Sequence, residues 1–254
     1  MRGDLLSGFC GAIAADGPMN KADTSSATAV IAIDGPAASG KSTVSRALAA
    51  RLGYRFLNSG DLYRAITWSC LSQDVDCRDT GAVAAAVGNS HVEIGCDGTD
   101  YYPVVDGTDP RAHLRDEAVN ANVSPVSAVP AVRYILSAAI RAHAQGRQTV
   151  VEGRDIGSAV FPETPYKFYI DAPVQVRQRR RRDQGQTEEI AKRDFIDSTR
   201  STDPLTIAPG ATVIDSSTLD VAGVVNAMLE KLREQGLVGG IGILPMPLRP
   251  CSNE

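Results

Sequence analysis

The feature that most constrains the fold is the octapeptide GPAASGKS, Gly35 to Ser42, one residue after the apolar run AVIAI. It fits the pattern G-x-x-x-x-G-K-[ST] at every specified position, with an apolar strand before it and a helix-forming segment after it. Glycines let backbone N–H groups turn inward around a polyphosphate, whose charge also meets the positive end of the helix dipole. The motif therefore predicts a nucleoside triphosphate site in an α/β fold.

Two side chains of this loop have expected tasks of their own. Lys41 is expected to reach the β and γ phosphates, and the hydroxyl of Ser42 to ligate Mg²⁺. The alternative is a glycine-rich turn with an incidental lysine, which the agreement of strand, loop and helix disfavours. The predicted ATP-binding residues of the loop are Gly35, Pro36, Ala37, Ala38, Ser39, Gly40, Lys41, Ser42 and Thr43.

The rest of the chain alternates strand-like and helix-like segments, as in a parallel α/β sheet. The segment 91–107 differs, because two partly alternating runs flank DGTD and predict an antiparallel hairpin inserted into the parallel core. Strands are expected within 28–34, 54–60, 149–153, 167–172 and 212–217, and helices within 39–53, 61–73, 128–146, 172–184 and 220–236.

Composition limits the classes of function. The net charge is −4 at pH 7, so the chain lacks the global basic field that drives nucleic-acid binding. No run approaches the roughly 18 apolar residues of a membrane helix. The five cysteines, an odd number without CxxC spacing, favour a reducing compartment. We expect a monomeric cytoplasmic protein that acts on small molecules, without nucleic-acid or membrane partners.

Several arginines stand close to turn residues: Arg64 in NSGDLYR, Arg154 in EGRDIG, and Arg193 and Arg200 in KRDFIDSTR. Phosphoryl transfer relies on positioning and on neutralisation of anionic oxygens, for which clustered arginines are suited. An acceptor that is itself a phosphate would need such a clamp and no general base, which agrees with the lack of an evident catalytic histidine. For each arginine alone, a surface salt bridge is the more common explanation.

Five stretches of the chain carry a family resemblance: IAIDGPAASGKST, NSGDLYR, VVEGRDIGSAVFP, KFYIDA and KRDFIDSTRSTDPL. In this order and spacing they closely resemble bacterial cytidylate kinases, which are nucleoside monophosphate kinases of the P-loop NTPase class. The likeness covers about residues 29 to 233. The phosphate loop is shared by many proteins, whereas EGRDIG followed by VFP, and RDxxDSTR, are much more specific. The resemblance implies transfer of phosphate from ATP to CMP or dCMP, with Mg²⁺.

The resemblance also implies roles for individual residues. Asp155 and arginines would pair with the cytosine edge. A buried Asp155 left without a donor would disfavour UMP. The site is expected to tolerate the missing sugar hydroxyl of dCMP. The main charge stabilisers would be Lys41, Arg154 and Arg193, and the acceptor phosphate would be held by Ser59, Arg64 and Arg154. Around the cytosine would lie Ser124, Arg133, Asp155 and Arg200. The sugar would be contacted by Arg193 and Asp197, and the adenine by Arg180.

The family fold is a parallel α/β core with an NMP-binding insertion, which has a small antiparallel sheet, and a mobile lid. By this resemblance we expect a three-layer α/β/α P-loop domain at 28–236, with the insertion at about 75–125 and a short helical lid at about 182–202. A polar extension, 1–27, and a Gly- and Pro-rich extended tail, 237–254, lie outside it.

Two stretches of the chain depart from the family pattern. NSGDLYR has Asn58 and Asp61 where the family usually reads DSGAxYR, and an extra carboxylate near an incoming phosphate would weaken binding unless it points away. In GTDPRAHLR, Arg115 matches the family better than its neighbours do.

The basic run RQRRRR, residues 177–182, has two interpretations, a nucleic-acid patch or a helix beside the triphosphate. We expect about half of it to face the triphosphate, and Arg177, Arg179 and Arg182 to lie on a solvated face. For the metal, Glu152 at a strand end is expected to orient Mg²⁺ through water, and Asp34 competes for that role. The functional alternatives are a kinase for another small acceptor and a nucleic-acid-dependent ATPase.

Overall fold

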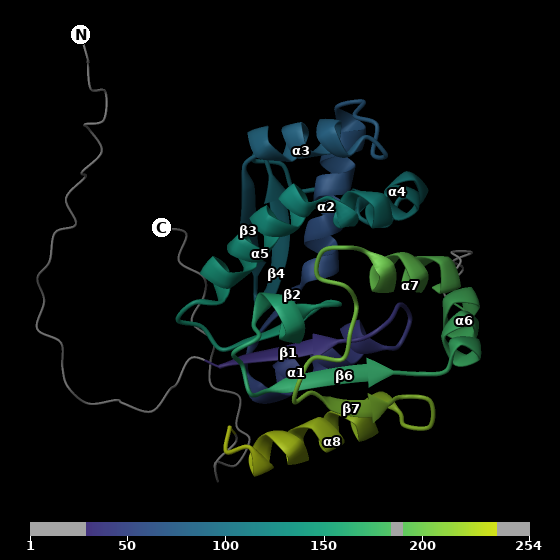
Figure 1. Ribbon diagram of the computed structural model, residues 1–254. Helices are drawn as coiled ribbons and strands as arrows, with labels where there is room; N and C mark the ends of the chain where they lie inside the picture. Colours follow the sequence, from purple (N-terminus) through teal and green to yellow (C-terminus); the bar gives the residue numbers. More distant parts are fainter. Residues whose placement is uncertain (1–28, 184–189, 238–254) are drawn as a thin grey trace, which may run out of the picture.

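The structure is a computed structural model that describes residues 29–183 and 190–237. The predicted extension 1–27, and all but the first residue of the predicted tail 237–254, lie outside the described residues. A central sheet of seven strands runs in the order β3-β4-β2-β5-β1-β6-β7, with helices on both faces (Figure 1). This arrangement confirms the predicted parallel α/β core.

The strands are parallel except for one hairpin at the sheet edge. β1 pairs in parallel with β5 and β6, β5 with β2, and β6 with β7. Their near-continuous apolar sequences fit strands covered on both faces. The bounds are β1 Val30–Asp34, β2 Arg55–Asn58, β3 Val92–Asp97, β4 Asp100–Val105, β5 Thr149–Glu152, β6 Lys167–Asp171 and β7 Thr212–Asp215.

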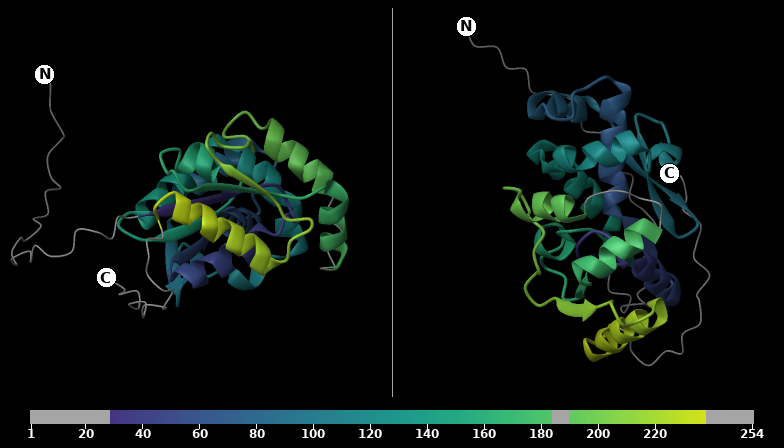
Figure 2. Two further views of the ribbon diagram at one scale, coloured as in Figure 1. Left: turned by 90° about the horizontal axis from the view of Figure 1, so that it is seen from below. Right: turned by 90° about the vertical axis from the view of Figure 1, so that its right-hand side faces the viewer.

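Two helical layers enclose the sheet. α1 and α8 pack together in the apolar cluster on one face, and α2 and α5 belong to the cluster on the other (Figure 2). The helices are α1 Lys41–Leu52, α2 Ser59–Ser72, α3 Thr80–Asn89, α4 Glu117–Ala128, α5 Pro130–Ala144, α6 Val174–Asp183, α7 Ile190–Thr199 and α8 Val221–Glu234, with a short 3-10 helix η1 at Arg111–His113 and a π-helix η2 at Ile156–Val160.

The predicted hairpin forms, but it does not make a separate sheet. β3 and β4 pair antiparallel across the turn at Gly98 and Thr99, and β4 then joins β2 through the single parallel pair Phe56 with Asp100. The hairpin therefore extends the edge of the main sheet. α3, α4 and η2 were not expected from sequence, and α4 contains Pro125.

The carboxyl ends of the central strands define the functional edge. β1 and β6 both point toward α6 and α7, and the loop that follows β1 leads into α1 at the same edge (Figure 1). In open α/β sheets, ligands bind outside the carboxyl ends of the strands. The predicted site residues gather at this edge.

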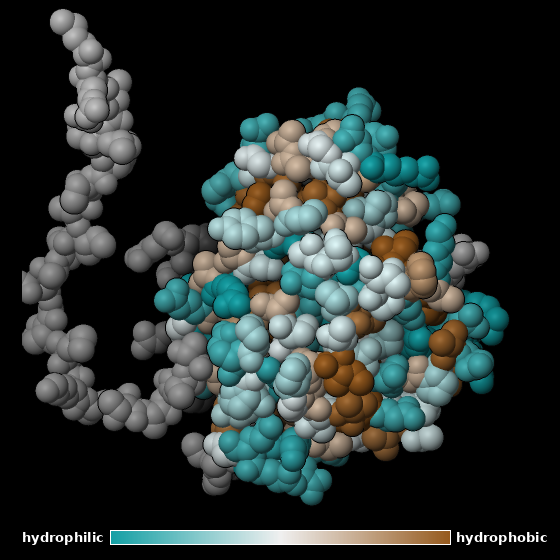
Figure 3. Space-filling model, viewed as in Figure 1, coloured by the Kyte–Doolittle hydropathy of each residue, from teal (hydrophilic) through white to brown (hydrophobic). Residues whose placement is uncertain are grey.

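Among the residues that the structure describes, no single helix is long and apolar enough to cross a membrane. The pair α4 and α5 together has the length and the apolar composition of a membrane span, but the two helices are bent by 93° relative to each other. On the face drawn in Figure 3, hydrophobic side chains lie in small groups among polar ones.

Candidate active site

The loop between β1 and α1 has the backbone that its glycines predict. Gly35 adopts φ 146°, and a Cβ there would lie 2.1 Å from the carbonyl oxygen of Ile170, so only glycine fits. Ala38 has φ 57°, a conformation rare for a residue with a side chain and characteristic of strained functional loops. Gly40 precedes the first residue of α1, which is Lys41. The loop thus ends on a helix N-terminus, as an anion site requires.

Lys41 and Glu152 meet beside this loop. The Lys41 ammonium donates to the carbonyl of Pro36 at 2.7 Å and lies 3.9 Å from Glu152 Oε1. Burial and the nearby Arg154 guanidinium lower the pKa of Lys41 to about 7. The other carboxylate oxygen of Glu152, Oε2, is buried without a hydrogen-bond partner. A cation ligated there would satisfy it, so the donor set fits Mg²⁺.

Asp34 has a different task from Glu152. Its two carboxylate oxygens accept the backbone N–H groups of Ile156 and Gly157, at 2.8 and 2.7 Å. Burial raises the pKa of Asp34 to about 7. Because both oxygens are engaged by η2, Asp34 fixes the turn that carries Arg154 and Asp155.

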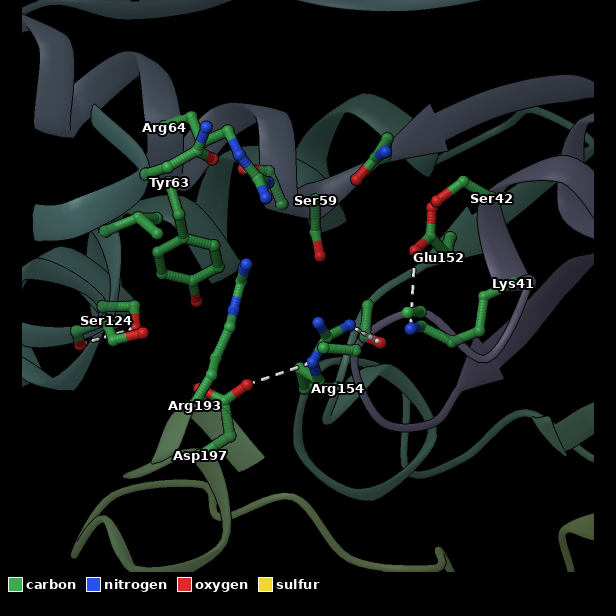
Figure 4. A pocket seen from close by; sticks show the side chains of 18 of the residues that line it. Lys41, Ser42, Ser59, Tyr63, Arg64, Ser124, Glu152, Arg154, Arg193 and Asp197 are labelled. Atoms are coloured by element: carbon green, nitrogen blue, oxygen red, sulfur yellow. Dashed lines mark hydrogen bonds and ion pairs between the residues drawn. The ribbon is translucent and has the colours of Figure 1, made fainter. Parts of the chain in front are cut away.

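A hollow opens between the phosphate loop, α2, α4 and α7. Figure 4 shows Lys41, Ser42 and Glu152 at one end, Arg64, Tyr63 and Ser124 at the other, and Arg193 and Arg154 between them. Its lining is Ala37, Ala38, Lys41, Ser42, Asn58, Ser59, Gly60, Tyr63, Arg64, Arg115, Asn120, Val123, Ser124, Ser127, Glu152, Gly153, Arg154, Asp155, Arg181, Arg193, Asp197 and Arg200.

Positive charge is concentrated in this hollow. Arg64 is buried and donates to the carbonyl of Gly60 at 3.0 Å. Burial, with the guanidinium groups of Arg193 and Arg115, lowers the pKa of Arg64 to about 9. Arg154 lies at the same site, and its Nε donates to Asp197 Oδ2 at 3.1 Å. Such crowding of cations favours binding of an anion.

Gly153 lets the strand end approach α2 closely. A Cβ on Gly153 would lie 2.6 Å from Ser59 Oγ, so a side chain there would displace the hydroxyl that faces the hollow. Glycine at this position therefore places Ser59 beside Arg154.

Asp155 is held between two arginines. Arg133, 1% exposed, donates to Asp155 Oδ2, and Arg200 donates to Oδ1 at 3.0 Å. Arg133 does not line the hollow but supports Asp155 from behind. Its guanidinium carbon lies over the Tyr63 ring, 5.5 Å from the ring centroid. Arg200 lines the hollow directly.

The basic helix α6 corrects one expectation. Arg177 is not on a solvated face: it is 5% exposed, donates to the carbonyls of Ala172 and Ala37 at 2.8 and 3.1 Å, and pairs with Asp194. It lies inward because these acceptors belong to the phosphate loop and to the residue that follows β6. Arg179 and Arg182 are exposed, as expected.

Arg180 also contacts the phosphate loop. Its guanidinium donates to the carbonyl of Ser39 at 3.2 Å and to the carbonyl of Ser216 at 2.6 Å. Its neighbour Arg181 lines the hollow.

Asp61 points to an arginine rather than into the hollow. Its Oδ1 lies 2.7 Å from Arg115 Nη2 and 4.0 Å from Arg64 Nη1, and it is not part of the lining. Asn58, by contrast, lines the hollow.

The structure brings together most residues that the sequence predicted. Most of the predicted site residues line the hollow. Those outside its lining are Asp34, Gly35, Pro36, Ser39, Gly40, Thr43, Arg133 and Arg180. Sequence reasoning missed Gly60, Tyr63, Asn120, Val123, Ser127, Gly153 and Arg181 as lining residues, and it gave Asn58 and Arg115 no role in the site. Tyr63 and Arg181 lie inside the motifs NSGDLYR and RQRRRR, other residues of which were assigned to the site. Their place in these motifs was therefore the available signal.

Within the described ranges, no group of three or more His, Cys, Asp and Glu side chains is arranged to hold a metal by itself. A metal at this site would therefore take some of its ligands from a substrate, as Mg²⁺ does from nucleotide phosphates.

Known proteins resemble the chain over nearly its whole described length. A family model for cytidylate kinase matches residues 31–234. A cytidylate kinase of Rhodococcus opacus (strain B4) is 39% identical over 227 residues, 85% of this chain and 99% of that protein. One of Mycobacterium avium (strain 104) is 40% identical over 227 residues, 84% of this chain and 99% of that protein. One of Caldanaerobacter subterraneus subsp. tengcongensis is 38% identical over 218 residues, 82% and 96% of the two chains.

Proposed function

The chain belongs to the cytidylate kinase family, and on that premise we propose that it transfers the γ-phosphoryl group of ATP to CMP and dCMP. The products are ADP and CDP or dCDP. The O–P bond to the γ-phosphorus of ATP breaks, and a bond from that phosphorus to an oxygen of the acceptor phosphate forms.

One observation carries the proposal: a phosphate loop and a cluster of arginines face each other across one hollow. Lys41 belongs to the loop end, and Arg64, Arg154 and Arg193 come from three other elements. An arrangement of this kind brings two anions together, which is the main difficulty of phosphoryl transfer to a phosphate. A hydroxyl acceptor would not need so many cations.

At the donor end, the loop residues 35–43 would bind the ATP phosphates, and Arg180 would bind near the adenine. Ser42 and Glu152 would hold Mg²⁺, which neutralises and orients the phosphates when bound. The unpartnered Glu152 Oε2 favours Glu152 over Asp34, whose oxygens are engaged by η2. Lys41 would stabilise charge on the transferring group.

At the acceptor end, Ser59, Arg64 and Arg154 would hold the phosphate, and Arg193 with Asp197 the sugar. Asp155 would accept a hydrogen bond from the cytosine N4 amine, with Ser124, Arg133 and Arg200 around it. Uracil carries a carbonyl at that position and would leave Asp155 facing an acceptor, so UMP is expected to be a poor substrate.

Two other functions have less support. A kinase for a hydroxyl acceptor would need a general base, yet Glu152, Asp155 and Asp197 in the hollow each lie beside a cation. A nucleic-acid-dependent ATPase would need the basic run at the surface, whereas Arg177 and Arg180 are directed onto the phosphate loop.

The proposal includes the organisation of the chain. The segments at about 75–125 and 182–202 would act as NMP-binding insertion and lid, which close on both substrates and exclude water. We further propose a cytoplasmic monomer.

An acceptor panel tests the proposal. ADP release is measured with MgATP and each of CMP, dCMP, UMP, AMP and shikimate, at equal concentrations. Turnover with CMP and dCMP far above the other acceptors is expected. If no monophosphate raises turnover above background, the kinase proposal fails, and stimulation of ATP turnover by DNA or RNA, with steep salt dependence, would support the ATPase instead.

A further inference from the structure

Asp203 lies between α7 and β7, within the stretch KRDFIDSTRSTDPL but with no role assigned to it from the sequence. Its backbone adopts φ 47°, the left-handed conformation that Asp and Asn tolerate better than other residues with side chains. The segment is anchored two residues later, where the Leu205 N–H donates to the carbonyl of Asp197 at 2.7 Å. The position of Asp203 is thus fixed by its backbone.

This one residue holds two arginines. Its carboxylate Oδ2 accepts from Arg133 Nε at 3.0 Å, and its backbone carbonyl accepts from Arg200 Nε at 2.7 Å and also from Arg200 Nη2. The side chain of Asp203 is 32% exposed, whereas that of Arg133 is 1% exposed. Asp203 therefore reaches from the surface to a guanidinium that solvent does not contact.

Both arginines converge on Asp155. Arg133 donates to Oδ2 of its carboxylate and Arg200 to Oδ1, so each oxygen has one fixed donor. Arg133 uses Nη1 on the carbonyl of Ser127 at 3.3 Å, which leaves Nε for Asp203. The result is a network of two guanidinium groups and two carboxylates, which Asp197 joins at 3.9 Å from Arg200 Nη1.

We infer that Asp203 is a positioning residue for recognition of the acceptor base, an inference that rests on the proposed function. It acts through Arg133 and Arg200, which set the direction of the Asp155 carboxylate toward the hollow. Without the Asp203 carboxylate, Arg133 keeps a buried N–H with no acceptor and turns toward Asp155 as its remaining counter-ion. Asp155 then loses the orientation that distinguishes an amine donor from a carbonyl.

Steady-state kinetics of Asp203→Asn and Asp203→Gly with CMP and UMP test this inference. Both residues tolerate a left-handed backbone; Asn removes the charge, and Gly removes the side chain but retains the carbonyl that holds Arg200. For the Gly variant, KM for CMP is expected to rise about tenfold and the CMP-over-UMP ratio of kcat/KM to fall about tenfold, with a smaller change in kcat. KM for ATP should change less than about twofold. The Asn variant is expected to lie between the Gly variant and the wild type.

Asp74→Gly is the matched control, because Asp74 is an exposed aspartate with φ 56° away from the site. It is expected to retain the wild-type ratio. Equal losses on CMP and UMP in Asp203→Gly, or an unchanged ratio with a lower melting temperature, would overturn the inference and leave Asp203 a structural residue. If the wild type itself does not phosphorylate CMP, the proposed function fails instead.

Discussion

Single residues set the charge balance of the hollow, and Lys41 is the clearest case. Burial and Arg154 lower the pKa of Lys41 to about 7, whereas a bound polyphosphate would favour its protonated form. Binding of ATP at a pH above about 7 should therefore be accompanied by net proton uptake at Lys41. The affinity for ATP should accordingly fall as the pH rises above about 7.

Titration calorimetry of ATP binding at pH 8, in two buffers of different ionisation enthalpy, measures this uptake. Lys41→Arg is the control, because an arginine stays protonated at this pH and should take up no proton from the buffer. An observed enthalpy that is the same in both buffers for the wild type would contradict the assignment.

Asp61 leads to a second prediction at this scale. Its carboxylate lies 2.7 Å from Arg115 and 4.0 Å from Arg64, so it neutralises cations that an acceptor phosphate would otherwise meet. Asp61→Ala is expected to lower KM for CMP by about two- to fivefold, and less at high salt.

The control for Asp61 is Asp97→Ala, which removes an aspartate paired with Arg111 at 3.1 Å on the exposed hairpin. It should leave KM for CMP unchanged. An unchanged or higher KM in Asp61→Ala would mean that Asp61 holds Arg115 in its productive place. The sequence predicted an extra carboxylate, that of Asp61, near the acceptor phosphate. The direction of this side chain could not be predicted, because it depends on Arg115, which comes from a distant segment.

Among the elements, α6 joins α7 to the phosphate loop through Arg177. This side chain bonds Ala37 and Ala172 and pairs with Asp194 of α7. Breaking a buried, hydrogen-bonded ion pair from one side leaves a charge without its partner, so Arg177→Ala should lower the free energy of unfolding by about 3 kcal/mol. Urea unfolding measures this loss.

Arg179→Ala, two residues along the same helix and exposed, should change the free energy of unfolding by less than about 0.5 kcal/mol. Equal effects in the two variants would place Arg177 on the solvated face after all. Sequence periodicity could not distinguish these two arginines, because α6 is polar on all sides and its inner face is defined only by the loop it packs against.

The helices that were not predicted from the sequence were missed for a similar reason, because local sequence signals do not define them. η2 is held by Asp34, which comes from β1, more than a hundred residues earlier. α4 continues through Pro125, a residue that ordinarily predicts a helix end. The strands and the helices α1, α2, α5 and α8 were predicted well, because their apolar patterns and the Gly53 C-cap of α1 are local signals.

For the whole molecule, the motifs of the sequence converge on one edge of the sheet. The phosphate loop, NSGDLYR, EGRDIG and KRDFIDSTR each contribute to the lining of a single hollow. Which residues support it from behind, such as Arg133 and Asp34, could not be read from spacing, because burial is set by the packing of distant segments. We expect this hollow to transfer a phosphoryl group between two nucleotides.

The most direct measurement is kcat/KM for CMP phosphorylation by MgATP in Arg154→Ala and in Arg141→Ala. Arg154 lies between the two ends of the hollow, whereas Arg141 pairs with Glu163 at 3.8 Å on the partly exposed end of α5. We predict a loss of about a hundredfold or more in Arg154→Ala and nearly wild-type activity in Arg141→Ala. Wild-type CMP phosphorylation by Arg154→Ala would contradict the account.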